Sequence, residues 1–221
     1  MIRKATAALA VLALICGLWT RANAASPRQG QEIALDTPLR ELVCLTVSAA
    51  LMRGIDSLPP GEQPGQAITE GMLTQALFRQ LLPEGGLALR EGQARVSYAE
   101  LADWYEQLFT YGTCVPLDHP LCPCLTVETE GLLFDLSPLY EDPVAGAAVY
   151  RMEENGEDIR LICDVFVCYQ NTLLAEEVPE DEIVWLCPAE ILLRPAPETR
   201  FGFTLSGFAL GPEYPETTEE N

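Results

Sequence analysis

Apolar residues recur every three or four positions in the first half of this chain and at every second position in the second half. The longer period is typical of amphipathic helices, and the alternation is typical of strands with one buried face. We therefore expect a single α+β domain over residues 37–210, with a helical part at 37–111 packed on a curved antiparallel sheet at 125–210. A polar lead-in (25–36) precedes this domain, and an acidic tail (211–221) that we expect to be disordered follows it.

Two helices are predicted from their first residues and their apolar spacing. Thr37 as N-cap, with Pro38 in the first turn, predicts a helix that runs to about Ser57 and buries one wide apolar stripe. Thr69 predicts the N-cap of a shorter helix that ends near Leu82. A loop rich in proline and glycine follows each of the two segments.

A third helix has the clearest signal in the chain. Ser97 is followed three residues later by Glu100, and this pair predicts a capping box. The apolar positions after it share one helical face, and they are Leu101, Trp104, Tyr105, Leu108 and Phe109. We therefore expect a helix that begins at Ser97 and turns this face to the core.

Strands are predicted over five segments of alternating pattern, at 125–134, 146–154, 158–170, 183–194 and 200–210, with a weaker candidate at 87–96. In the fourth segment the odd-numbered positions are expected on one side of the sheet, and they are Ile183, Trp185, Cys187, Ala189, Ile191 and Leu193. In the last segment the apolar positions change parity at Gly207, which predicts a β-bulge.

The pair Asn155-Gly156 is the strongest hairpin signal, because a type I′ turn needs positive φ at both of its central residues. Taking these two residues as the loop predicts three apolar pairs in the core, namely Met152–Ile159, Tyr150–Leu161 and Ala148–Cys163. The opposite face is then expected to be solvated and to carry two like-charged pairs, Arg151–Arg160 and Glu153–Asp158.

The first 24 residues have the three parts of a secretory signal peptide: the charged Arg3-Lys4, an apolar run over 5–19 and the small-residue site Ala22-Asn23-Ala24. The apolar run is shorter than the roughly 20 residues that a membrane-spanning helix needs. We expect cleavage near Ala25, an extracytoplasmic location that is either secreted or cell-envelope associated, and no transmembrane segment after cleavage. The pattern leaves a retained anchor open as the alternative.

The charge of the chain restricts its partners. The formal net charge is −20, and loss of Arg3, Lys4 and Arg21 with the leader takes it to −23 and leaves no lysine. Such a field repels phosphate backbones and anionic lipids, so we expect no nucleic acid among the partners. Hydrophobic residues make up 48% of the sequence, which favours a folded core over a disordered acidic chain.

Nucleophilic catalysis has little support in the sequence. His119 is the only histidine, so a Ser-His-Asp or Cys-His arrangement would require it. It lies in a proline-rich loop beside Asp118, and the chain has no nucleophile elbow. We expect His119 to be an exposed loop residue. The acidic clusters at 153–158 and 176–182 lack the ligand spacing of a calcium loop, and we expect both to be solvated turns.

The cysteines leave several readings open. Seven remain after the leader, an odd number. Cys114, Cys122 and Cys124 with His119 are close enough in sequence for a metal site, a disulfide from Cys114 to Cys122 or Cys124, free thiols, or redox activity of Cys122-Pro123-Cys124. The spacing matches neither structural zinc knuckles nor the usual two-residue redox dithiol, so the disulfide and the free thiols are favoured.

Three other cysteines are expected in the core. Cys163 and Cys187 lie on the inward faces of strands that we expect to be neighbours, where buried thiols are favoured over a cross-strand bridge. Cys44 lies inside the first predicted helix. We assign no catalytic, cofactor-binding or metal-ligating residue to the chain, and no cofactor.

Three stretches, at 134–140, 184–186 and 200–205, resemble uncharacterised secreted proteins of anaerobic Gram-positive bacteria. This resemblance extends loosely over residues 38–210 and implies localisation but no activity. The order of helices and then strands is similar to the cone-shaped folds of nuclear transport factor 2 and of cystatin-like proteins, which implies a sheet that curves around helices and leaves a pocket.

The function that these observations favour is a non-enzymatic binding domain at the cell envelope, for a small molecule or an envelope protein. Two alternatives come from other classes of protein. One is an extracytoplasmic enzyme that uses carboxylates in a pocket between sheet and helices, and the other is a cysteine-based metal-binding protein.

Overall fold

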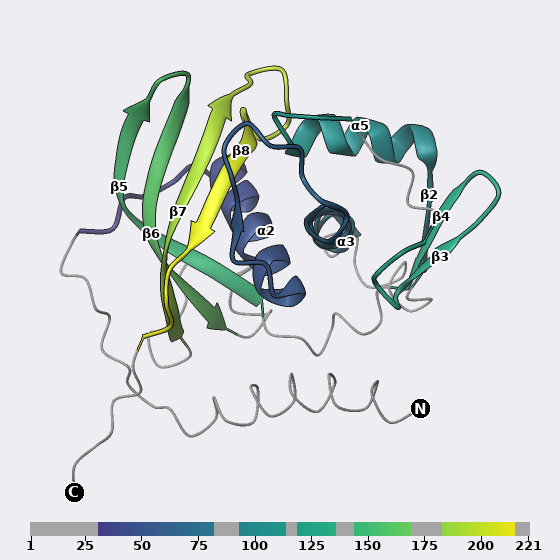
Figure 1. The fold of residues 1–221 in the computed structure, drawn as a ribbon, viewed down its shortest axis with the longest axis horizontal. Helices are drawn as coiled ribbons and strands as arrows, with labels where there is room; N and C mark the ends of the chain where they lie inside the picture. Colours follow the sequence, from purple (N-terminus) through teal and green to yellow (C-terminus); the bar gives the residue numbers. More distant parts are fainter. Residues whose placement is uncertain (1–30, 82–92, 114–118, 136–143, 169–182, 215–221) are drawn as a thin grey trace, which may run out of the picture.

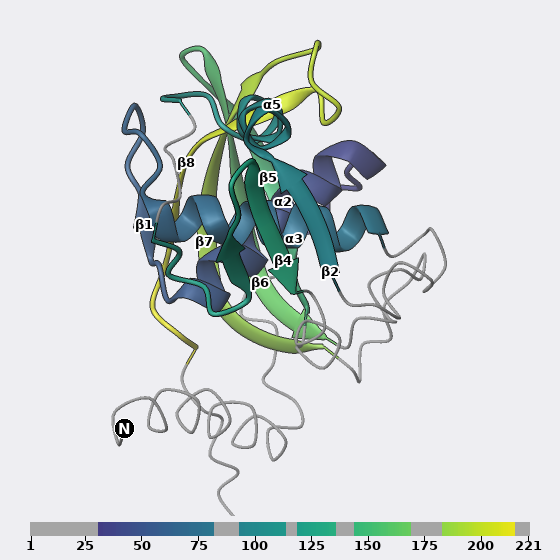
Figure 2. The ribbon, with the colours of Figure 1, turned by 90° about the vertical axis from the view of Figure 1, so that its right-hand side faces the viewer.

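The computed structural model describes residues 31–81, 93–113, 119–135, 144–168 and 183–214. In this part of the chain three helices lie between two antiparallel sheets, which confirms the α+β class (Figures 1 and 2). The larger sheet has the strand order β1-β8-β7-β6-β5, and the smaller sheet has the order β2-β4-β3. In Figure 1 the larger sheet stands at the left, the smaller sheet at the right, and the helices lie between them.

The helices are α2 (Thr37–Arg53), α3 (Gln66–Leu81) and α5 (Tyr98–Leu108). The strands of the larger sheet are β1 (Ser57–Leu58), β5 (Val144–Asn155), β6 (Asp158–Cys168), β7 (Val184–Pro195) and β8 (Phe203–Leu210). The strands of the smaller sheet are β2 (Gln93–Ser97), β3 (Leu125–Val127) and β4 (Gly131–Asp135).

Helix α2 begins and ends slightly earlier than its sequence predicts. Its N-cap is Asp36 and not Thr37, because the Asp36 carboxylate accepts a hydrogen bond from the backbone N–H of Leu39 at 3.0 Å. The helix ends at Gly54, which has φ of +61° and whose N–H bonds to the Leu51 carbonyl. A residue without Cβ reaches this left-handed conformation easily, so the helix stops three residues before Ser57.

The central parts of helices α2 and α3 are buried on all sides, whereas the sequence predicts helices that each bury only one apolar face. Residues 42–50 of α2 are all buried, and so are residues 68–78 of α3. Helix α2 contacts both the larger sheet and α3, so its middle part, residues 42–50, has no solvated face, while most of its first turn is exposed. Helix α3 begins at Gln66, so Thr69 is an interior residue whose hydroxyl donates to the Gly65 carbonyl instead of capping the helix.

The prediction for α5 is confirmed. The Ser97 hydroxyl accepts from the Glu100 N–H at 3.2 Å, and the Glu100 carboxylate accepts from the Ser97 N–H at 2.8 Å, which completes the capping box. The apolar face packs into the core, with Leu101, Tyr105, Leu108 and Phe109 buried and Trp104 half-buried.

The smaller sheet corrects the expectation of one continuous sheet from residue 125 onward. Residues 125–134 do not form one strand but the hairpin β3–β4, and β4 also pairs with β2. The strand β2, in the region of the weaker candidate at 87–96, is therefore a partner of this hairpin and not of the larger sheet. The larger antiparallel sheet begins only at β5, and the helices are covered by strands on two sides.

The register of the β5–β6 hairpin is shifted from the predicted one. Asn155 pairs with Asp158, so the turn residues are Gly156 and Glu157, and Gly156 has φ of +68°. The predicted pairs Met152–Ile159, Tyr150–Leu161 and Ala148–Cys163 are wrong, and the observed ones are Met152–Leu161, Ala148–Asp164 and Val149–Cys163. Tyr150 is the extra residue of a bulge.

This shift also removes the two like-charged pairs. Arg151 now stands opposite Ile162, and Glu153 stands opposite Arg160. Opposite charges across a strand pair stabilise a hairpin, whereas like charges destabilise it, so the electrostatic term favours the observed register.

Two further bulges set the faces of β7 and β8. An irregularity between Val165 and Phe166 places Trp185 opposite Phe166, in a small cluster on the face away from the helices. The prediction that Ile183 and Trp185 share the core face of Cys187 is therefore wrong, although Cys187, Ala189, Ile191 and Leu193 do face the core. The bulge predicted in the last strand is confirmed, with Ser206 as the unpaired residue.

Two terminal segments are bound to the larger sheet. The Ile33 N–H donates to the Val149 carbonyl of β5 at 2.7 Å. After β8, the N–H groups of Gly211 and Tyr214 donate to the Pro188 and Leu186 carbonyls of β7, both at 2.8 Å. Residues 211–214 thus continue along β7, and the prediction of a disordered tail is wrong for them, while 215–221 lie outside the described residues.

Candidate functional site

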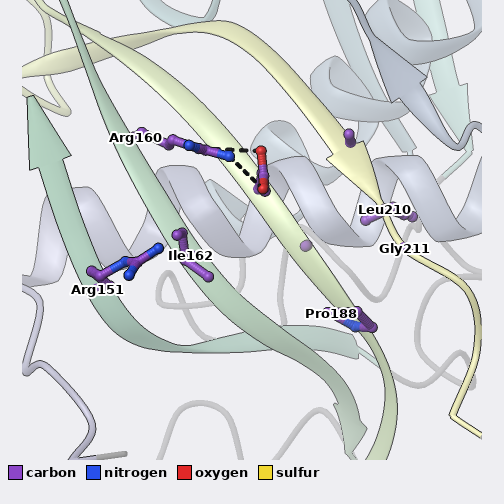
Figure 3. Close-up of a pocket in the computed structure, with 9 residues that line it drawn as sticks. Arg151, Arg160, Ile162, Pro188, Leu210 and Gly211 are labelled. Atoms are coloured by element: carbon purple, nitrogen blue, oxygen red, sulfur yellow. Dashed lines mark hydrogen bonds and ion pairs between the residues drawn. The ribbon is translucent and has the colours of Figure 1, made fainter. Parts of the chain in front are cut away.

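A groove of about 340 Å³ crosses the outer face of the larger sheet, the face turned away from α2 (Figure 3). Its lining comes from four strands and the segment after β8, and consists of Arg151, Arg160, Ile162, Pro188, Ala189, Glu190, Ala209, Leu210 and Gly211. We call it the outer groove.

The strand registers place the main residues of the outer groove in one row. Arg151 pairs with Ile162, Ile162 with Glu190, and Glu190 with Ala209. Because directly paired residues of antiparallel strands project on the same face, this row runs across β5, β6, β7 and β8. Because the side chain of Ala209 is small, the row projects least from the sheet surface at its β8 end.

Ion pairs border the row. Arg160 binds Glu190 through two hydrogen bonds, from Nη2 at 2.5 Å and from Nε at 3.2 Å. These bonds raise the pKa of Arg160 above its usual range. Arg151 pairs with Glu153 at 2.8 Å, and its side chain is 62% exposed. Exposed pairs of this kind contribute little to stability, so their charged groups can exchange partners when a ligand arrives.

The lining of the outer groove combines apolar and charged side chains. It includes one carboxylate, Glu190, and two guanidinium groups, Arg151 and Arg160. Pro188, Ala209 and Leu210 offer apolar surface, and the buried Ile162 forms part of the groove floor. Charged groups of both signs border it. An apolar surface with a few placed polar groups is the usual composition of a ligand-binding surface.

A buried carboxylate lies beside the outer groove on the same sheet face. Asp164 stands opposite Pro188 and is 0% exposed. Its Oδ1 accepts a hydrogen bond from the Tyr214 hydroxyl at 2.5 Å, while its Oδ2 has no hydrogen-bond partner among the described residues. This bond fastens the segment after β8 across β7 to β6.

The sequence predicts that the acidic turn at 153–158 is solvated, and this is wrong for Asp158. Asp158 is 11% exposed and accepts from Arg194 Nε at 2.9 Å and from the Ser206 hydroxyl at 2.7 Å. Arg194 also donates to the Tyr111 hydroxyl at 2.9 Å and lies over its ring. This network joins the hairpin to β7, β8 and the segment after α5. The second predicted acidic turn, 176–182, lies outside the described residues.

The residues that the sequence singles out around His119 lie beside α3. Cys122 and Cys124 form a disulfide with each other, which corrects both favoured expectations, a bond from Cys114 to one of them and free thiols. Cys114 and Asp118 lie outside the described residues. His119 is exposed, as predicted, and its backbone carbonyl accepts a hydrogen bond from Gln66.

The disulfide bears on the metal hypothesis, because its two sulfurs are no longer available as thiolate ligands. Within the described ranges no cluster of three or more His, Cys, Asp or Glu has the geometry to hold a metal ion.

Glu70 holds this loop in place and is the functional group that sequence reasoning missed. It is 0% exposed, and its carboxylate accepts from the N–H of Leu121 at 2.9 and 3.0 Å, from the N–H of Cys122 at 2.8 Å and from Gln66 Nε2 at 2.6 Å. The sequence does contain a signal, because Glu70, Leu73 and Leu77 follow core spacing. Asp164, inside an apolar run, carries the same signal.

The remaining cysteines with predictions are buried. The Cys163 thiol donates to the Ala189 carbonyl at 3.6 Å. Burial raises the pKa of Cys187 to about 11, with smaller contributions from Glu213, Asp164 and Asp56. Burial also raises the pKa of Cys44. All three thiols are buried, as the sequence predicts for core cysteines, and the raised pKa values favour the protonated form of Cys44 and Cys187.

No family of known proteins, no curated protein and no solved structure matches this chain. In the described ranges, no helix is long and apolar enough to cross a membrane. The geometry of the outer groove is therefore the main basis for assigning a function.

Proposed function

We propose that this chain is an exported, non-enzymatic binding domain that holds an extended segment of a cationic protein partner in the outer groove. The observation that carries this proposal is the row Arg151–Ile162–Glu190–Ala209, which joins apolar surface and charged border in one open groove.

The shape and composition of the groove support a peptide ligand. The groove is open and crosses four strands, so a chain segment can lie along it, with an apolar side chain over Ile162 and Pro188. Glu190 already accepts from Arg160, but a carboxylate has about four acceptor sites and can take a further cationic donor. A lysine or arginine of the partner fits this position.

The net charge of −20 supports a partner of the opposite sign. A field of this strength raises the association rate of cationic molecules, and salt reduces the effect. The leader pattern in residues 1–24 supports export, because its three parts match a secretory signal peptide.

Selection of peptides tests this proposal. A phage-displayed random peptide library is selected against the purified protein, and enriched sequences are synthesised and measured by fluorescence anisotropy. We expect enriched peptides that combine basic and apolar residues and that bind more weakly as salt increases. Ala209→Trp fills the groove and should raise Kd by about tenfold or more, equivalent to about 1.4 kcal/mol.

Thr126→Trp is the matched control, because Thr126 is an exposed strand residue of the smaller sheet. It should change Kd by less than about twofold. Glu190→Gln should weaken the binding of basic peptides and reduce its dependence on salt. Equal affinity of the wild type and Ala209→Trp for every enriched peptide would show that the outer groove is not the site.

A further inference from the structure

The bond between Cys122 and Cys124 closes a loop with one intervening residue, Pro123, and its two Cα atoms are 5.2 Å apart. The stabilisation that a disulfide provides through loop closure grows with the length of the loop. A bond across one residue therefore adds little of that stabilisation and connects no distant parts of the chain. The position of the Cys122–Cys124 bond therefore favours a chemical role over a role in stabilising the fold.

The two sulfur-bearing residues differ in accessibility. Cys122 is buried, with 6% of its surface exposed, while Cys124 is only half-buried. Leu121, which precedes the disulfide, and Pro123, which lies between the two cysteines, are both exposed. The loop therefore lies at the surface of the molecule. An incoming thiolate can therefore approach Cys124 more easily than Cys122, and Cys122 is the leaving group.

Hydrogen bonds hold the loop on both sides of the disulfide. Glu70 binds the N–H groups of Leu121 and Cys122, as described above. The Cys122 carbonyl accepts from Leu125, and the Cys124 carbonyl accepts from Asp135 of β4 at 2.7 Å. None of these bonds uses the sulfur atoms. The backbone geometry therefore persists when the disulfide is reduced, and the two thiols remain positioned to re-form it.

We propose that Cys122 and Cys124 form a thiol–disulfide exchange site that oxidises dithiols of other polypeptides. A substrate thiolate attacks Cys124 Sγ, the bond to Cys122 Sγ breaks, and Cys122 leaves as a thiolate that takes a proton from water. The second substrate thiolate then attacks the mixed disulfide and releases Cys124. The substrate loses two electrons and becomes a disulfide, and the protein gains them as two thiols.

Exchange with a synthetic peptide that contains two reduced cysteines tests this proposal. The purified protein and the peptide are mixed without oxygen, quenched by alkylation and analysed by mass spectrometry for each cysteine. We expect one peptide disulfide for each Cys122–Cys124 bond that is lost. The double variant Cys122→Ser/Cys124→Ser should oxidise no peptide above the rate without protein.

A second measurement tests the asymmetry and uses each single variant. In Cys122→Ser, the remaining Cys124 thiol should react with an aromatic disulfide reagent about tenfold faster than the Cys122 thiol does in Cys124→Ser. Should a variant fail to fold, the wild-type exchange alone decides. A Cys122–Cys124 bond that stays oxidised in the folded protein under a hundredfold excess of the dithiol peptide would overturn the proposal.

Discussion

At the scale of single residues, Glu70 is the buried polar side chain that binds the loop with the disulfide to α3. It is fully buried and satisfies two backbone N–H groups of another segment, more than 50 residues away in sequence. Removing it leaves the buried Cys122 N–H without its partner, while the part-buried Leu121 N–H loses its two contacts to the carboxylate. Its carboxylate therefore couples α3 to the loop that contains the disulfide.

Glu70→Ala should lower the free energy of unfolding by about 3 kcal/mol, measured by urea denaturation. The matched control is Glu128→Ala, because Glu128 makes an exposed ion pair with Arg95. The control should change stability by less than about 0.5 kcal/mol. Equal losses in the two variants would show that the loop does not depend on Glu70.

Cys187 gives a prediction about alkaline pH. Its pKa in the folded state is raised to about 11, above the ordinary thiol value of about 8.5, because burial disfavours the thiolate. A raised pKa stabilises the fold fully below the unfolded-state value, and this stabilisation is lost as pH rises through the folded-state value. The difference in unfolding free energy between wild type and Cys187→Ala should therefore narrow between about pH 8.5 and 11. A difference that stays constant from pH 7.5 to 11 contradicts this assignment.

Individual residues show which structural features could be predicted from the sequence and which could not. The capping residues Ser97 and Glu100 were predictable, because their effect is local and depends on a fixed spacing. Glu70 was visible only as an acidic residue at a core position, since its hydrogen-bond donors come from residues 121 and 122. The outer groove could not be predicted, because it requires the register of four strands.

At the scale of elements, α5 depends on its capping box. The pKa of Glu100 is held below its usual range, first by the hydrogen bond from the Ser97 backbone and then by that from the Ser97 side chain. A depressed pKa contributes stability above the unfolded-state value of about 4.3, and this contribution is lost as pH falls through the folded-state value.

Two variants test this element. Ser97→Ala should cost about 1 kcal/mol at neutral pH. Glu100→Ala should be less stable than wild type from pH 5 to 8, and the difference should shrink progressively as the pH falls below about 4.3. Glu106→Ala on the exposed side of α5 serves as control and should show no such pH dependence. A pH-independent effect of Glu100→Ala would exclude the capping carboxylate as its source.

The hairpin shows why strand register is harder to predict than strand existence. The turn signal at Asn155-Gly156 is real, but the loop is Gly156-Glu157, one residue further on. Pairing Glu153 with Arg160 supplies the electrostatic reason, and the bulge at Tyr150 then restores the core face for Val149. The bulge at Tyr150 is marked by no glycine and no change of apolar parity, unlike the bulge in β8, so the pattern misassigns the strand faces beyond it.

At the scale of the whole molecule, the segment after β8 completes the larger sheet. The bond from the Tyr214 hydroxyl to Asp164 spans β7 and reaches a carboxylate with no exposed surface. Tyr214→Phe removes this hydrogen bond to a buried side chain and should lower the unfolding free energy by about 2 kcal/mol in urea denaturation.

Tyr98→Phe is the corresponding control, because the Tyr98 hydroxyl makes a long bond of 3.5 Å at a position that is 37% exposed. It should have an effect within about 0.5 kcal/mol. If Tyr214→Phe is as stable as this control, the terminal segment contributes nothing to the stability of the sheet.

The enclosure of α2 has a consequence for folding. Helix α2 ends at Arg53, whereas the strands that it contacts, β5 and β8, begin only at Val144 and Phe203. Contacts of such long sequence separation form late in folding. The burial of α2 therefore depends on most of the described chain being present, and its apolar surface stays uncovered until these strands are in place.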